Sequence, residues 1–495
     1  MTDQARLADE AINQSFGYQQ ELRRALKLFS LYAVAFSIIS ITTGLFANYG
    51  FGLAHLGAAM IWLWPVAAVG QMLIALVVAE LGTRIPLAGY SYQWGARLVN
   101  TTYGWFTGFV GLCYLAVGAA AINFVVEAPI IATILNLDPA NPTSNLVITL
   151  IIFIAVLAIN IISIALASRI NNIAVFAEIA GMVGFGVILF ILWALKPNHP
   201  ITFLGDTGGV HGFDIVAALP FAALMGIFTL VGFELAADLG EEAVAARITV
   251  PKAVVWSVAT SAILGMIALI GFTIAIPDLR TISASPVPLV DIVQYWMGDI
   301  AKDVFVVIVV FAIFALDVIG LAATGRLIFS FARDNILPFS SQLRIVNPRT
   351  QTPIRALVTA SSLGLVFVAW GYVSSVTGKG GDAFLLLITA TATLPFIVYF
   401  LTVLAYVMRR HRMDKLPEAF DLGVWARPVM IAALAWTLIA LGALMIPQAF
   451  WRADVVVVIV LAVAALWYFA ALRGRLARGE AGVEALVSQA RNTSE

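Results

Sequence analysis

Long apolar segments recur along the whole chain, and each is about as long as a helix must be to cross the hydrocarbon of a bilayer. Such segments lie at 29–52, 57–81, 104–132, 146–166, 170–195, 214–238, 252–276, 303–331, 355–376, 382–408, 426–447 and 452–472. Of the 495 residues, 61% are hydrophobic and 11% are charged, and a soluble core cannot absorb that apolar excess. The sequence therefore predicts an all-α polytopic membrane protein with 12 transmembrane helices.

The positions of Lys and Arg predict the orientation of these helices, because cytoplasmic loops are rich in both residues. If the N-terminus is cytoplasmic, all but five of the 28 Lys and Arg residues lie on the cytoplasmic side. The five on the outer side are Lys196, Arg280, Lys302, Lys379 and Arg452. We therefore expect a multi-pass plasma-membrane protein with cytoplasmic segments at 1–28 and 473–495, the second of which is amphipathic and suited to contact lipid.

Several classes of function are disfavoured by what the sequence lacks. Its one cysteine, Cys113, permits no intramolecular disulfide or multi-thiolate metal site, and its four histidines are far apart. The formal net charge is zero, which gives no reason to expect nucleic acid as a partner. The loops are short and contain no GxxxxGK[ST] phosphate loop, so an ATP-driven pump is disfavoured. We expect no enzyme activity and no cofactor, and a secondary transporter is the default interpretation.

Two of the expected helices contain a polar or glycine-interrupted run halfway along their length. The run in the first span is 37–46, and the run in the sixth is 226–234. These spans begin two five-helix halves, 29–195 and 196–408, which would enter the membrane from opposite sides and form an inverted repeat. Two extra helices follow at 409–472. The alternative is that Gly, Ser and Thr only allow close helix packing.

A break in a helix would make a binding site for a small charged solute. Its new N-terminal end exposes amide N–H groups that can hold a carboxylate, and its new C-terminal end exposes carbonyls that can hold an ammonium group. A small zwitterion would fit between the two ends. An acid facing the amine, with no backbone N–H left free for a carboxylate, would instead favour choline or a polyamine.

Three motifs in the same order resemble those of amino acid–polyamine–organocation superfamily permeases. Residues 232–253 resemble the signature of span 6, residues 326–338 resemble the segment that ends span 8, and residues 87–105 are similar to the loop between spans 2 and 3. The likeness covers 25–475 and is closest to the amino acid/choline transporter branch, whose members carry GABA, choline and related amines. It implies the five-plus-five inverted-repeat fold of the bacterial leucine transporter.

The resemblance also implies substrate-binding positions in spans 1 and 6. Thr43 and Gly44 match the family's carboxylate-binding Ser-Gly, and Phe228 matches the aromatic residue that closes over the substrate. The expected substrate-binding residues are Ser40, Thr42, Thr43, Gly44, Phe228, Thr229, Val231 and Gly232. The family's usual Gly-x-Gly is Thr42-Thr43-Gly44 in this sequence, and the larger Thr42 side chain would narrow the pocket or shift the carboxylate.

Acidic residues inside the expected spans are candidates for ion coupling, because a charge at mid-membrane depth is costly and usually faces a cavity. Glu178 occupies a position where the resemblance implies a lysine in proton-coupled relatives, and Asp317 lies near the corresponding cation site. A proton relay, sodium coordination, a contact with a cationic substrate and a structural hydrogen bond are all open. Glu234 is expected to act in gating together with Phe228.

Other polar residues are weaker candidates. Glu241 and Glu242, at the inner end of span 6, are expected to make gating contacts or to cap a helix. Glu127 and Asn123, toward the outer end of span 3, are possible pocket-lining residues.

Together these features predict a secondary active transporter that imports a small amino acid or related amine, such as GABA, by alternating access with proton coupling. The alternatives are a choline or polyamine permease, a sodium-coupled transporter or exchanger, and a membrane sensor of solutes that transports nothing. The expected partners are the substrate, a proton or sodium ion, and membrane lipid. The sequence leaves the oligomeric state open.

Overall fold

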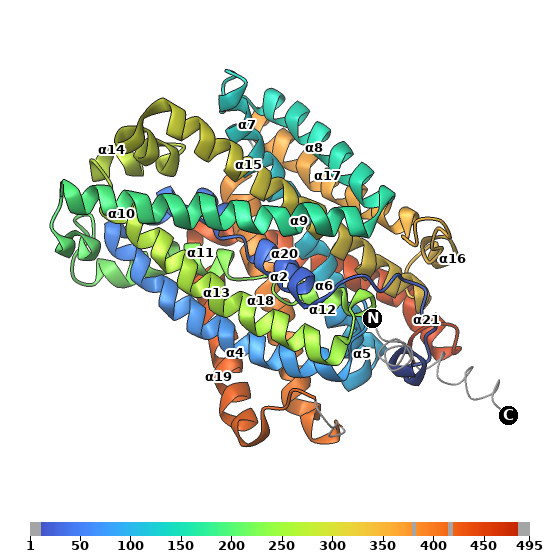
Figure 1. Ribbon diagram of the computed structural model, residues 1–495. Coiled ribbons are helices and arrows are strands. Elements are labelled where there is room, and N and C mark those ends of the chain that lie inside the picture. The colour runs from blue at the N-terminus through green and yellow to red at the C-terminus, as the bar shows by residue number, and fades with distance from the viewer. Residues whose placement is uncertain (1–10, 379–382, 414–418, 484–495) are drawn as a thin grey trace.

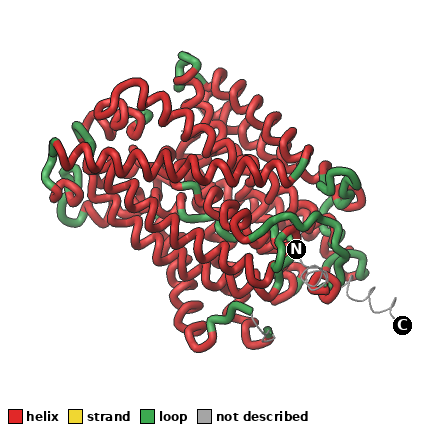
Figure 2. Tube along the Cα trace, in the orientation of Figure 1, coloured by secondary structure: helices red, strands yellow, loops and turns green. Residues whose placement is uncertain are grey.

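The computed structural model describes residues 11–378, 383–413 and 419–483. These residues form helices joined by loops and include no strand, as Figure 2 shows. A single isolated bridge pairs Leu26 with Ala243. The all-α class predicted from the sequence is therefore confirmed. Parts of the expected terminal segments, residues 1–10 and 484–495, lie outside the described residues, as does Lys379.

Long helices account for most of the described chain. In chain order they are α2 (Leu28–Ile39), α3 (Ile41–Leu56), α4 (Leu63–Arg84), α6 (Thr101–Ala120), α8 (Pro142–Ile162), α9 (Ile164–Glu178), α10 (Phe185–Leu195), α11 (Asp214–Thr229), α13 (Ala246–Ile274), α15 (Pro288–Arg333), α17 (Ile354–Thr377), α18 (Ala383–Arg409), α19 (Ala426–Met445) and α20 (Trp451–Trp467). Two short helices, α7 (Ala128–Ile134) and α12 (Leu235–Asp238), follow α6 and α11 after an interruption. Short helices connect them: α5 (Tyr90–Leu98), α14 (Leu279–Ser283), α16 (Ser340–Leu343) and α21 (Arg473–Ala477).

Ten helical runs among the described residues are long and apolar enough to cross a membrane. One of them, Leu28–Arg84, covers both the first and the second expected span. Helix α11 is also apolar, but it is shorter than these ten runs and is not one of them. The length and apolar character of these runs support a polytopic membrane protein. The count of 12 helices and the inverted repeat remain predictions.

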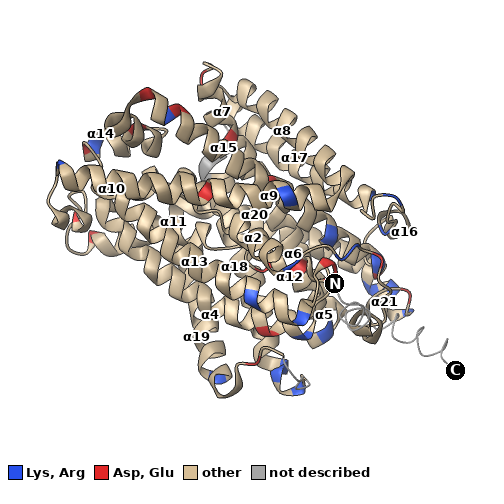
Figure 3. Cartoon of the chain, viewed as in Figure 1, with Lys and Arg blue, Asp and Glu red and all other residues tan. Residues whose placement is uncertain are grey.

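The helices lie side by side as one bundle, with α14 at one end and α5, α16 and α21 at the other (Figure 1). Large apolar side chains point outward from the bundle, including Val69 on α4, Ile154 on α8 and Val458 on α20, each more than 60% exposed. Such a surface suits lipid rather than water. Lys and Arg residues gather at the end with α5, α16 and α21 (Figure 3), which is the end expected to face the cytoplasm.

The first expected span is broken at Ser40, which separates α2 from α3. Ser40 has a φ of 37°, in the left-handed region, and its backbone N–H donates to the Phe36 carbonyl to close α2. Its hydroxyl oxygen accepts a hydrogen bond from the Thr43 N–H and so caps the start of α3. Serine is well suited to this position because its short side chain can satisfy an otherwise free amide of the new helix. The interruption predicted within 37–46 is confirmed.

The sixth expected span is broken between α11 and α12. Gly232 lies in this unwound stretch with a φ of 92°, a conformation that residues with a Cβ rarely adopt. A Cβ at this position would also lie 2.1 Å from Cγ2 of Ile38 on α2. The glycine therefore permits both the turn and the close approach of the two broken helices, and the interruption predicted within 226–234 is confirmed.

Three π-helical turns occur among the described residues: η2 (Ala121–Glu127) between α6 and α7, η3 (Ile179–Gly184) between α9 and α10, and η9 (Tyr468–Leu472) between α20 and α21. Two of them adjoin an acidic residue, because η2 ends at Glu127 and η3 directly follows Glu178. Single π-helical turns inside α-helices are frequent at functional sites. Both acidic residues are buried.

We predict that Gly271→Ala destabilises the bundle, because Gly271 on α13 packs directly against the backbone of α10. An added Cβ would lie 1.9 Å from the carbonyl oxygen of Gly186, and backbone cannot move aside as a flexible side chain can. Overpacking of this kind costs about 1–3 kcal/mol or more. Thermal unfolding of the purified protein in detergent should show a lower Tm. Gly205→Ala, whose Cβ would meet nothing within 4 Å, is the matched control; equal Tm values for the two variants would contradict the backbone contact.

Candidate functional site

A cavity lies beside the two helix interruptions. Its walls come from both broken spans and from α6, α8, α15, α17 and α18. Most of the lining is apolar, including Leu115, Phe153 and Val156. The polar lining side chains are Thr43, Tyr114, Asn123, Asp317, Thr324, Ser361 and Thr391. A mostly apolar cavity with a few polar groups is the usual form of a small-molecule site.

Four of the eight expected substrate-binding residues line this cavity: Thr43, Gly44, Phe228 and Val231. Gly44 also lets the two broken helices touch, since a Cβ there would lie 1.9 Å from Oγ1 of Thr229. The other four expected residues lie at the interruptions or directly beside them, without lining the cavity. They are Ser40, Thr42, Thr229 and Gly232.

The N-terminal end of α3, expected to hold a substrate carboxylate, is occupied by the protein's own side chains. The Thr42 N–H donates to Oε1 of Glu178 at 3.0 Å, and the Ser40 hydroxyl donates to the same oxygen at 3.1 Å. The next two amides, of Thr43 and Gly44, donate to the hydroxyl and carbonyl oxygens of Ser40. The carboxyl group of Glu178 thus takes the place in which a ligand carboxylate would sit at this helix end.

Asp317 lines the cavity from α15, and its acidic neighbour is Glu127 rather than Glu178. The carboxyl groups of Asp317 and Glu127 are close enough to interact, and Asn123 is adjacent to Asp317. Glu178 does not line the cavity. In the sequence Glu127 stands 190 residues before Asp317, so only the tertiary structure brings the two acids together.

Several oxygen atoms of this acidic group have no hydrogen-bond donor among the described residues. They are Oδ1 of Asn123, Oδ2 of Asp317 and both carboxyl oxygens of Glu127. We call Asn123, Glu127 and Asp317 the acceptor cluster. Buried acceptors without donors are uncommon in proteins, and each calls for an explanation such as a ligand, an ion or a proton.

Glu234 stabilises the unwound stretch of span 6 through Tyr399 on α18. The Tyr399 hydroxyl donates to Oε2 of Glu234 at 2.6 Å and accepts the Gly232 N–H at 3.0 Å. The Tyr399 ring also stacks on Phe233. Tyr399 was not anticipated from the sequence, because one tyrosine in an apolar helix carries no signal of its contacts.

Buried ion pairs join span 6 to α15 immediately beyond the cavity, at the end of the bundle where α5, α16 and α21 lie. Arg326 donates from Nε to Glu242 at 2.6 Å, and both side chains are 1% exposed. Arg333 makes two parallel hydrogen bonds to the carboxylate of Glu241, at 2.7 and 3.0 Å. Arg326 follows the cavity-lining Thr324 by two residues. Glu241 and Glu242 therefore connect separate elements instead of only capping a helix.

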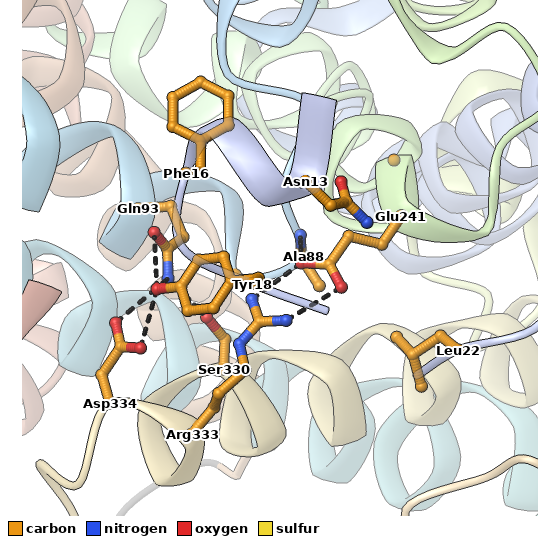
Figure 4. A network of polar contacts seen from close by, with 12 residues as sticks. Asn13, Phe16, Tyr18, Leu22, Ala88, Gln93, Glu241, Ser330, Arg333 and Asp334 are labelled. Carbon is orange, nitrogen blue, oxygen red and sulfur yellow. Dashed lines mark hydrogen bonds and ion pairs between the residues drawn. The ribbon is translucent and has the colours of Figure 1, made fainter. Parts of the chain in front are cut away.

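The segment before α2 packs over the Arg333–Glu241 ion pair (Figure 4). The guanidinium of Arg333 lies 3.6 Å from the centre of the Tyr18 ring, and the Tyr18 hydroxyl donates to Asp334 at 2.7 Å. Burial raises the pKa of Asp334, and the positive charge of Arg333 and hydrogen bonds from Tyr92 and Tyr18 oppose that rise. We call Tyr18, Glu241, Glu242, Arg326, Arg333 and Asp334 the closure cluster.

The closure cluster brings together the three motifs found in the sequence. Glu241 belongs to the span-6 motif and accepts the backbone N–H of Ala88, from the loop between spans 2 and 3, at 3.0 Å. Arg333 comes from the motif that ends span 8. These segments are far apart in the chain, and their charges and backbone groups satisfy one another at one place.

The fold and cavity define a polytopic membrane protein with a solute-sized site between two interrupted helices. A family model described as amino acid permease matches residues 26–469, and the chain belongs to this family, within the amino acid–polyamine–organocation superfamily. Membership indicates a transporter rather than an enzyme.

Named relatives are similar to this chain over most of their length. The amino-acid permease BAT1 of Arabidopsis thaliana is 24% identical over 85% of this chain and 85% of its own. The thiamine transporter thi9 of Schizosaccharomyces pombe is 23% identical over 88% of this chain and 79% of its own. The GABA-specific permease of Saccharomyces cerevisiae is 24% identical over 89% of this chain and 79% of its own. These identities support transport of an amino acid or amine as a class.

We predict that Arg333→Gln opens the end of the cavity near the closure cluster. Removal of the guanidinium leaves Glu241 buried without its ion-pair partner, a change that costs several kcal/mol in buried pairs. Thr324→Cys in a Cys113→Ser background would place a single cysteine on the cavity wall. A membrane-impermeant maleimide should label it faster in inverted vesicles when Arg333→Gln is added. Arg478→Gln, which removes an exposed ion pair with Glu480, is the control; identical labelling rates in the two variants would count against closure by Arg333.

Proposed function

We propose that this protein is a secondary active transporter that carries a small amine-bearing solute across the plasma membrane by alternating access. The observation that carries the proposal is the cavity beside two interrupted helices, with buried ion pairs beyond one end of it. Broken helices at membrane depth are tolerated only where they line a cavity or are buried in protein. The named relatives support the class of solute, since their names refer to amino acids, GABA and thiamine.

The closure cluster is the element that must open for solute to leave toward the cytoplasm. Its ion pairs link span 6 to α15, and the contact of Arg333 with the Tyr18 ring links α15 to the segment before α2, so these elements are held together while the cluster is intact. Separation of a buried ion pair costs little net free energy when both charges regain water, because their hydration offsets the lost attraction. Such a pair therefore suits a contact that forms in one state and breaks in another. Import and an N-terminus in the cytoplasm are parts of this proposal.

A proton is the coupling ion that we propose, with Glu178 as one carrier. The ionised carboxylate accepts the Thr42 N–H and the Ser40 hydroxyl, so its charge holds the start of α3 against α9. Protonation would remove that charge and weaken its attraction to the positive end of the helix. Protonation of Glu178 would thereby change the position of α3 relative to α2. Asp317 is the second proposed coupling residue, and sodium is the alternative ion.

Uptake by proteoliposomes tests the proposed transport directly. Purified protein is reconstituted and given labelled GABA, choline or putrescine under an inwardly directed proton gradient, an inwardly directed sodium gradient or neither. Accumulation above that of protein-free liposomes, abolished by a protonophore, supports proton-coupled transport. Binding of these solutes without any flux or counterflow would instead identify a membrane sensor.

We predict that Glu178→Gln abolishes gradient-driven accumulation, because glutamine keeps much of the shape but cannot carry a proton. Exchange of labelled for unlabelled solute, which needs no net proton movement, should continue. Both are measured in the same proteoliposomes. Glu480→Gln, at an exposed ion pair outside the cavity, is the control. Accumulation at the parent level in Glu178→Gln would remove this residue from coupling.

We predict that Phe228→Ala weakens the retention of bound solute. Phe228 is 6% exposed and lines the cavity near the end of α11, so its ring covers part of the space that the solute would occupy. Truncation of a buried aromatic at a binding site typically costs about 2 kcal/mol or more, or more than tenfold in affinity. Equilibrium binding by scintillation proximity gives the affinity. Phe469→Ala, on the outward-facing surface, should leave it unchanged, and parent affinity in Phe228→Ala would refute the covering role.

A further inference from the structure

We propose that the solute of this cavity is a cationic amine that lacks a carboxylate next to its nitrogen, and that its ammonium group binds at the acceptor cluster of Asn123, Glu127 and Asp317. This inference rests on the transport proposed above and narrows the substrate class. Two independent features carry it: the helix end suited to a carboxylate is already filled, and the free polar wall of the cavity contains acceptors without donors.

The filled helix end removes the site that an α-amino acid would need for its carboxylate. The amides of Thr42, Thr43 and Gly44 donate to oxygens of Glu178 and Ser40 within the chain. A ligand carboxylate would have to displace Glu178, and the two negative charges would then share one helix end. A ligand without a carboxylate meets neither obstacle.

The acceptor cluster provides what an ammonium group lacks in an apolar cavity. A primary ammonium group has three N–H donors and no acceptor, and the cluster offers unpartnered oxygens of Asn123 and Asp317 at the cavity wall. Glu127 does not line the cavity, and its unpartnered carboxyl group adds a second acid next to Asp317. Asp317 and Asn123 line the cavity, and Asp317 is 6% exposed. Among the lining residues there is no Lys, Arg or His that could neutralise the acids or pair with a ligand carboxylate.

The electrostatics of the acceptor cluster also favour a cation. Two carboxyl groups close together in a buried place repel each other unless a proton or a cation lies between them. Glu127 is fully buried and Asp317 nearly so, which leaves little water to screen that repulsion. Binding of one positive charge would supply both the missing donors and the missing counter-charge. The hydroxyls of Ser361, Thr324 and Thr391 remain for other polar groups of the solute.

Ligand-induced thermal stabilisation of the purified protein distinguishes the substrate classes. The probes are n-butylamine and putrescine on one side, and 2-aminobutyrate and butyrate on the other. We expect the two cations to raise Tm in a saturable way, with 2-aminobutyrate and butyrate giving little or no shift. A larger shift with 2-aminobutyrate than with n-butylamine would overturn the proposal. Stabilisation by sodium chloride alone, with no response to any amine, would assign the cluster to a coupling ion and overturn it as well.

Conservative variants test the cluster itself. Asp317→Asn and Glu127→Gln should each weaken the apparent affinity for the cations by roughly tenfold or more, the effect of losing a hydrogen bond to a charged group. Asp303→Asn is the matched control, because Asp303 is an exposed acid on the same helix, α15. Equal cation affinity in Asp317→Asn, Glu127→Gln and Asp303→Asn would refute the assignment.

A gain-of-function variant tests the filled helix end. Glu178→Ala frees the Thr42 N–H, so 2-aminobutyrate should now stabilise the protein at least as well as n-butylamine does. An unchanged preference for the cations in a folded Glu178→Ala protein would show that Glu178 does not exclude carboxylates. Failure of this inference and failure of transport are distinguishable: uptake restricted to α-amino acids would refute the inference alone, and cation binding without flux in proteoliposomes would refute transport alone.

Discussion

Every backbone N–H and C=O group at membrane depth must find a partner inside the protein, because lipid offers none. An unbroken helix meets this requirement within itself, and a broken helix must meet it elsewhere. In this protein the partners at the two breaks include side chains from distant helices. Glu178 and Ser40 satisfy the start of α3, and Tyr399 satisfies Gly232 in the unwound stretch of span 6. The cavity exists where these interruptions leave room between helices.

Buried charged groups must likewise find a partner inside the protein. The buried arginines near the cavity are paired with glutamates from another element, Arg326 with Glu242 and Arg333 with Glu241. The acids of the acceptor cluster have no such partner among the described residues. One set of charges is thus complete within the protein, which suits a contact that holds the structure closed. The other set is incomplete, which suits a ligand. The difference between satisfied and unsatisfied charge separates the proposed gate from the proposed site.

Much of this arrangement could be predicted from the sequence, because it depends on local patterns. The spans follow from the length of apolar runs, and both breaks coincide with the runs of small and hydroxyl-bearing residues that contain Ser40 and Gly232. The family follows from three motifs in order, and the matching family model confirms it. The role of Tyr399 and the pairing of Glu127 with Asp317 could not be predicted in this way. Each depends on which face of a helix meets which neighbour, and a helix that is apolar on all sides gives no such signal.

The sequence by itself determined that the chain is helical, that it belongs in a membrane and where two of its helices break, since backbone hydrogen bonding and the hydrophobic effect act on nearby residues. Only the tertiary structure decided what meets those breaks. The expectation that the amides of α3 lie open to a substrate carboxylate followed from considering one helix alone. Packing of α9 against the break brings Glu178 to those amides instead. The N-terminal end of a helix stabilises whichever negative group packs against it. Contacts between segments far apart in the chain decide which group that is.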